Sequence, residues 1–212
     1  MLVPEVAEPM VRLALGAPLR LADGPYPFDE PPDLIRLATR AERLDCLKQH
    51  LQSLCPLWDK LARRFLDAYF AWIDATVAAG TAELQALADR AGGLFAPADW
   101  SFAALRPLPQ AHLPADDGAP VRADLAFWTG TSLVAIEMLG TMSPRKQRRE
   151  ELARLAAAGA VLVEIEGAAL EREGERLLAQ TLPPAFAHFW RGVALPSSPF
   201  GPAALDEIRL AD

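Results

Sequence analysis

The feature that most constrains this chain is a pair of apolar segments separated by one tight turn. Residues 121–128 (VRADLAFW) and 132–139 (SLVAIEML) are both typical of strands, and Gly130-Thr131 suits the central positions of a type II′ turn. The register that follows pairs Thr129 with Ser132. The same register places Asp124 opposite Glu137. The sequence therefore predicts a β-hairpin with two carboxylates side by side.

The predicted register also assigns a face to every hairpin residue. One face is apolar throughout and is expected to be buried: Val121, Ala123, Leu125, Phe127, Val134, Ile136 and Met138. The other face holds the two acids among Arg122, Ala126, Trp128, Leu133, Ala135 and Leu139. Cβ atoms of opposed residues lie only ~5 Å apart, and like charges there are destabilising. The pair therefore needs a compensating cation, a shared proton or a basic side chain.

Two interpretations of the carboxylate pair remain open at this point. A divalent ion such as Mg²⁺ or Mn²⁺ is one solution, because Mg²⁺ is commonly held by one or two carboxylates and keeps several waters. The alternative is a structural ion network with Arg122 and the basic residues between Arg145 and Arg149. A slip of the hairpin register would weaken the argument for a metal site.

The segments around the hairpin predict an α/β domain that spans residues 1–212. We expect an irregular arm over 1–32, a helical region over 33–93, an α/β core over 95–191 and a Pro-rich tail over 192–212. In the helical region, one helix is expected from about residue 34 to 54 and a second over 57–79, with an apolar face from Trp58 to Ile73. After the hairpin, Ser143-Pro144 predicts a helix start, Gly159 its end, and residues 160–167 the next strand. The result is a mixed sheet between helices.

These elements resemble the PD-(D/E)XK nuclease superfamily, which has the restriction-endonuclease-like fold. The resemblance covers residues 95–170 and rests on Asp124, Glu137 at the end of the apolar strand LVAIE, and the helix and strand that follow. It implies that Asp124 and Glu137 bind Mg²⁺ or Mn²⁺, that the Met138 carbonyl is a further ligand, and that the protein hydrolyses DNA phosphodiesters as an endonuclease or exonuclease.

The sequence departs from this family at the lysine of the motif, where Leu139 stands instead. Arg122 or Lys146 could replace that positive charge, and both are candidate catalytic residues beside the two acids. Arg145, Lys146 and Arg149 at the start of the predicted helix would also suit a DNA phosphate. The alternative function is a nuclease-fold protein that has lost catalysis and acts as a binding or assembly module.

Composition excludes several other classes of protein. A formal net charge of −7 argues against a general nucleic-acid-binding surface, although it allows one local basic site. Two cysteines cannot form a disulfide framework, and the chain shows neither a signal-peptide pattern nor a long apolar run, so a cytoplasmic location is expected. Cys46, His50 and Cys55 lack the short ligand pairs typical of zinc sites. The aromatic residues of the second helix, Trp58 and Trp72 included, are expected in the core.

Overall fold

The structure is a computed structural model that describes residues 10–12, 18–20, 36–93, 95–113, 119–129, 132–140 and 145–191. Side chains are described for these ranges except 10–12, 18–20 and 145–148. The expected turn at Gly130-Thr131, the expected helix start at Ser143-Pro144 and the expected tail over 192–212 lie outside these residues.

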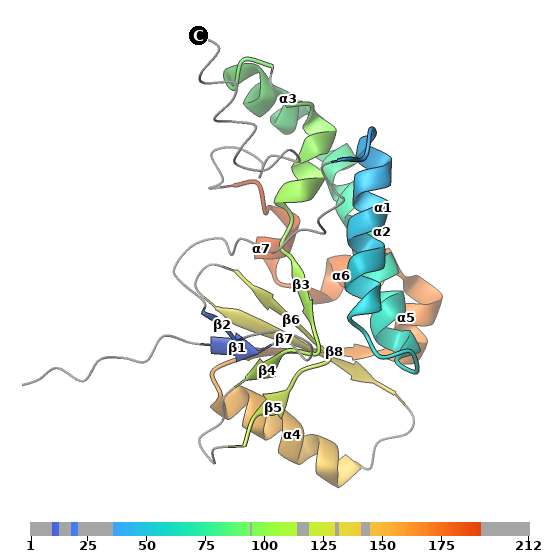
Figure 1. Ribbon diagram of the computed structural model, residues 1–212, viewed down its shortest axis with the longest axis vertical. Coiled ribbons are helices and arrows are strands. Elements are labelled where there is room, and N and C mark those ends of the chain that lie inside the picture. The colour runs from blue at the N-terminus through green and yellow to red at the C-terminus, as the bar shows by residue number, and fades with distance from the viewer. Residues whose placement is uncertain are drawn as a thin grey trace, which may run out of the picture.

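The chain forms a mixed α/β fold built on a four-stranded sheet in the order β3-β6-β7-β8 (Figure 1). Three of its strands are antiparallel neighbours: β3 (Pro107–Pro109), β6 (Leu125–Trp128) and β7 (Leu133–Leu139). Helix α4 (Arg145–Ala157) then crosses over to β8 (Val161–Glu166), which lies parallel to β7. Gly159 follows α4 with a φ of 82°, a left-handed conformation that favours glycine at a helix end.

The hairpin register is confirmed. Leu125 pairs with Ile136, Phe127 with Val134 and Trp128 with Leu133, which is the register derived from the turn. Beside the turn, the Thr129 N–H donates to the Ser132 carbonyl over 3.0 Å. The short turn and the apolar alternation therefore predicted the observed pairing of the two strands.

The prediction of one continuous strand over residues 121–128 is wrong. The run breaks at Ala123-Asp124, and its first part forms β5 (Val121–Arg122) in a second sheet of order β2-β1-β4-β5. The neighbours of β5 in that sheet are β1 (Met10–Arg12), β2 (Pro18–Arg20) and β4 (His112–Leu113). The six residues of β1 and β2 were expected in an irregular arm. The hairpin register, continued to Arg122, would place it opposite Leu139, but Arg122 pairs with His112 of β4 and the described β5 forms no ladder with β7.

The break in the strand also redistributes the predicted apolar face. Val121 and Ala123 pack with Ala126 and Ala135 in a cluster that includes Leu155 of α4. Leu125, Phe127, Val134 and Ile136 remain on the opposite face as predicted, in the larger core. Both faces of the β6–β7 hairpin are therefore buried, one under α4 and the other under the remaining helices.

The larger core lies between the sheet and six α-helices, most of which lie together on one side in Figure 1. These helices are α1 (Arg40–Ser53), α2 (Lys60–Ala79), α3 (Thr81–Arg90), α5 (Gly167–Glu173), α6 (Glu175–Thr181) and α7 (Pro184–Ala187), and a 3-10 helix, η2 (Pro97–Ala103), follows α3. Aromatic rings fill its centre: the Phe127 ring lies 5.2 Å from that of Tyr69 and 4.9 Å from that of Phe186. Aromatic pairs at such distances contribute beyond the area they bury.

The first two helices begin later than predicted. Thr39 and Glu42 form a capping box, which starts α1 at Arg40. The Asp59 carboxylate accepts a hydrogen bond from the Ala62 N–H over 3.0 Å and thereby starts α2 at Lys60. Trp58 consequently lies in the connecting turn and is 71% exposed, whereas Trp72 is buried as expected.

No helix in the described part of the chain is both long enough and apolar enough to cross a bilayer.

Candidate functional site

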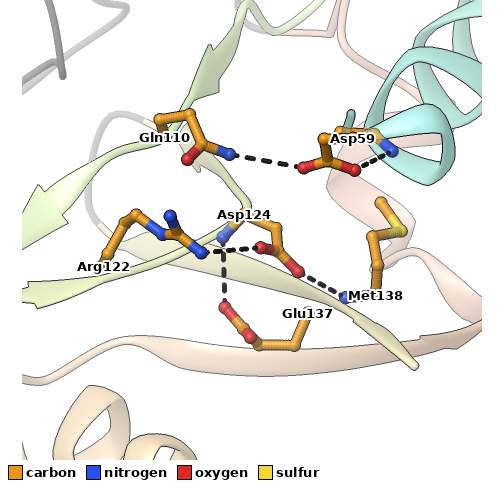
Figure 2. Close-up of polar contacts among 7 residues, drawn as sticks. Asp59, Gln110, Arg122, Asp124, Glu137 and Met138 are labelled. Atoms are coloured by element: carbon orange, nitrogen blue, oxygen red, sulfur yellow. Dashed lines mark hydrogen bonds and ion pairs between the residues drawn. The ribbon is translucent and has the colours of Figure 1, made fainter. Parts of the chain in front are cut away.

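Asp124 and Glu137 lie next to each other where β6 begins and β7 continues beyond it (Figure 2). The Asp124 N–H donates to Glu137 Oε1 over 3.2 Å, and the Met138 N–H donates to Asp124 Oδ2 over 3.0 Å. The Asp124 carboxylate thus accepts the hydrogen bond of a β7 N–H that would pair with a backbone carbonyl if the neighbouring strand continued. The interruption between β5 and β6 lets the Asp124 side chain reach this N–H. The same interruption therefore brings the two acids into contact.

The surroundings of Asp124 and Glu137 disfavour a negative charge on both carboxylates at once. Burial raises the pKa of Glu137 most, followed by the charge of Asp124 and to a smaller extent that of Glu151 of α4, and the result is a pKa of about 8. The Asp124 N–H and Arg122 act in the opposite direction, but they do not compensate. Near neutral pH and without a bound cation, Glu137 therefore holds a proton.

Arg122 is the cation that the described residues place closest to the pair. Its guanidinium lies 3.8 Å from Asp124 Oδ1, as the dashed line in Figure 2 shows, and its side chain is 44% exposed against 19% for Asp124. An exposed ion pair at this distance contributes little stability. Arg122 is therefore able to move without a large energetic cost, and it supplies positive charge on the side of Asp124 away from Met138.

The residue of β7 at the position of the motif lysine carries no charge. Leu139 is half-buried at the end of β7 and pairs with Glu166 of β8. The Met138 carbonyl, expected as a metal ligand, accepts a hydrogen bond from the Gly140 N–H over 3.1 Å, and the Met138 side chain packs against the larger core.

The start of α4 is the other expected source of positive charge. Arg145 and Lys146 lie in its first turn, with side chains outside the described set, and Arg149 is exposed. Among the described side chains of α4, the one whose charge acts on Glu137 is Glu151, an acid. The structure thus brings Arg122 to the pair and leaves the role of Lys146 as a prediction.

Two residues that the sequence did not point to, Asp59 and Gln110, adjoin the pair. Gln110 is buried and has a φ of 54°, which is uncommon for a non-glycine residue. Its backbone N–H donates to the Asp124 carbonyl over 2.9 Å, and its Nε2 contacts Asp59 Oδ2 at 3.5 Å (Figure 2). Asp59 was missed because the second helix was expected to start at residue 57. An Asp just before a helical run is an N-cap signal, whereas nothing in the sequence marks Gln110.

Other acids and thiols of the helical region serve different purposes. Asp67 accepts a hydrogen bond from Gln52, and Asp74 lies beside Ser101, away from the pair. Cys55 is buried near Asp59 and Asp124, and burial followed by these charges raises the pKa of its thiol to about 11. A thiol with so high a pKa is a poor nucleophile and a poor metal ligand at neutral pH.

The donor atoms at the pair fit a hard divalent cation. They are carboxylate oxygens with a backbone carbonyl beside them, and Glu137 Oε2 has no hydrogen-bond donor within the described residues. In the described part of the chain, no group of three or more His, Cys, Asp and Glu side chains converges to hold a metal ion. Any ion here would therefore depend on two carboxylates and retain water in its remaining positions.

Comparisons with known proteins found no match to this chain. No family model matches it, and neither the curated proteins nor the solved structures give a significant match.

Proposed function

We propose that the protein is a metal-dependent nuclease that hydrolyses DNA phosphodiesters at Asp124 and Glu137, on a restriction-endonuclease-like fold. The observation that carries this proposal is the carboxylate pair: Asp124 directly before β6 and Glu137 on the antiparallel neighbour β7, whose carboxylate accepts a hydrogen bond from the Asp124 backbone N–H. Burial beside Asp124 holds the pKa of Glu137 at about 8, and a carboxyl with a pKa so far from its ordinary value is typical of functional sites.

The residues divide the work of the proposed site between them. The Asp124 and Glu137 carboxylates would hold Mg²⁺ or Mn²⁺, with the Met138 carbonyl as a further ligand. The ion would stabilise the charge that develops on the phosphate and on the leaving oxygen. Arg122 would bind a non-bridging phosphate oxygen, because its half-exposed guanidinium lies 3.8 Å from Asp124 Oδ1, on the side of that carboxylate away from Met138. Lys146 is the second candidate for this charge.

Metal titration and DNA cleavage test the proposal together. Isothermal titration with Mn²⁺ should show one weak site in the parent, and Asp124→Asn and Glu137→Gln should each remove it. The parent with Mn²⁺ should nick plasmid DNA. Arg122→Gln should retain Mn²⁺ binding and lose most of the nicking, whereas Arg90→Gln, on exposed α3, is the matched control and should change neither.

The alternative function, a nuclease-fold protein without catalysis that acts as a binding or assembly module, is favoured by Leu139 in the place of the motif lysine. Mn²⁺ binding without nicking, in the parent and in Leu139→Lys, would select that alternative. No Mn²⁺ binding at millimolar concentrations would refute the metal site and leave the ion network of Arg122 and Asp124. Nicking that survives in Asp124→Asn would refute the proposed residues.

A further inference from the structure

The turn between α1 and α2 exposes two large apolar side chains next to each other. Leu57 is 85% exposed and Trp58 is 71% exposed, and the one other large hydrophobic residue exposed to a similar degree in the described part of the chain is Val161, at 48%. Trp72, Trp100, Trp128 and Trp190 are all buried. Packing therefore accounts for every tryptophan except Trp58.

This turn lies beside the carboxylate pair. Asp59, the residue after Trp58, contacts Gln110, whose backbone N–H donates to the Asp124 carbonyl (Figure 2). The first turn of α2 also packs against the end of β7, through Gly167 at the start of α5. A Cβ added to Gly167 would lie 2.9 Å from the Leu61 side chain of α2 and 3.3 Å from the Leu139 carbonyl of β7. The beginning of α2 is thus packed at the end of β7 where the acids lie, and Trp58 extends from it into solvent.

Cations outnumber acids in the segment that follows Trp58, in a chain whose formal net charge is −7: Lys60, Arg63 and Arg64 against Asp59, whose partly buried carboxylate caps α2. Lys60 and Arg64 are both exposed on the first turns of α2, one helical turn apart, and α2 has no acid in its first turn. No ion-pair partner for either one occurs within the described residues. Arg122, on the other side of the acids, is half-exposed as well.

We propose that Trp58 stacks on a base of a single-stranded nucleic acid whose phosphates are held by Lys60 and Arg64, so that the strand leads to Asp124 and Glu137. Aromatic side chains next to cations are how proteins bind unpaired strands, because every base offers a face for stacking and the backbone supplies the charge. A base inside a duplex has no free face. The inference rests on the proposed function for the reaction that the strand undergoes, and adds that the substrate is unpaired where it is bound.

Strand binding without metal tests this inference separately from cleavage. The probe is a fluorescein-labelled oligothymidylate in EDTA, with affinity measured by anisotropy. Trp58→Ala should weaken binding by about tenfold, the typical effect of removing one stacked base, and Trp58→Phe should retain most of the affinity. Val161→Ala, which shortens an exposed apolar side chain elsewhere, is the control and should leave binding unchanged.

Charge and fluorescence give two further measurements on the same surface. Lys60→Glu and Arg64→Glu should each weaken binding and reduce its dependence on salt, whereas Arg90→Glu should not. Oligothymidylate should also quench the tryptophan emission of the parent and not that of Trp58→Ala, because the other tryptophans are buried.

Three results would overturn the inference: a parent that does not bind the oligonucleotide, equal affinity of the parent and Trp58→Ala, or tighter binding to a blunt duplex of the same length. Binding of the parent to anionic vesicles in place of the oligonucleotide would also overturn it. Asp124→Asn separates the two proposals, because it should abolish nicking and leave strand binding intact. Strand binding by Trp58 in a protein that never nicks DNA would refute the nuclease and support the strand site.

Discussion

Replacing Glu137 with Gln should stabilise the protein at alkaline pH and leave it almost unchanged in acid. Glu137 has a pKa of about 8 in the folded chain, against an ordinary value of 4.5. The folded state therefore binds more protons than the unfolded state between these two values, and the free energy of unfolding falls as the pH rises through that range. At about 1.4 kcal/mol per unit of pKa, the loss is at most about 5 kcal/mol.

The measurable loss is smaller than this ceiling. Glu137 is only partly buried, and water and local movement screen a charge at such a site, so we expect about 2 to 3 kcal/mol. Gln has the size of protonated Glu, and its amide oxygen can accept the Asp124 N–H as Glu137 Oε1 does. The variant should therefore gain this amount at pH 8.5 and almost nothing at pH 4.5.

Urea unfolding followed by tryptophan fluorescence at several values of pH measures the difference. Glu166→Gln is the control, because Glu166 is an exposed acid on the neighbouring strand β8, and its curve should follow that of the parent. Mn²⁺ should compete with the proton, so that saturating metal removes most of the alkaline loss in the parent. Equal pH dependence of the parent and Glu137→Gln would refute the reasoning, because the cost would then lie elsewhere.

Two substitutions and one labelling experiment test how the site and the core around it are supported. Asp59→Ala should lower the free energy of unfolding by about 1 kcal/mol through the lost cap of α2, whereas Asp67→Ala, exposed on the same helix, should change it by less than about 0.5 kcal/mol in urea titrations. Phe127→Ala removes a fully buried ring and should cost about 4 kcal/mol, measured in the same way. In the native protein, an aromatic disulfide reagent at pH 8 should label Cys46 before Cys55, because burial raises the pKa of Cys55 to about 11; equal rates would contradict that burial.

The sequence predicted well where a signal is local. Apolar alternation and the short turn determined the β6–β7 register, which brought Asp124 and Glu137 together without any other part of the chain. Gly159 marked the end of α4, since its left-handed φ is a property of that one position. The change from helical to strand period likewise predicted the order of the elements and the α/β class.

Errors arose where two signals compete over a few residues. Pro56 suits a helix start, yet Asp59 caps α2, because a carboxylate that accepts a backbone N–H stabilises the first turn more than a fixed φ alone. Trp58 has helical spacing to the core residues that follow, and it is exposed because the helix had not yet begun.

By itself, the sequence determined the acid pair: strand residues alternate strictly, and a two-residue turn fixes which of them face each other. Only the tertiary structure decided the surroundings of that pair. The strand breaks at Ala123 because β4 and β5 belong to a second sheet, and this break lets the Asp124 carboxylate reach the Met138 N–H. Asp59 and Gln110 arrive from segments 65 and 14 residues before Asp124. Contacts across such separations depend on how whole layers pack, and no local pattern in the chain records them.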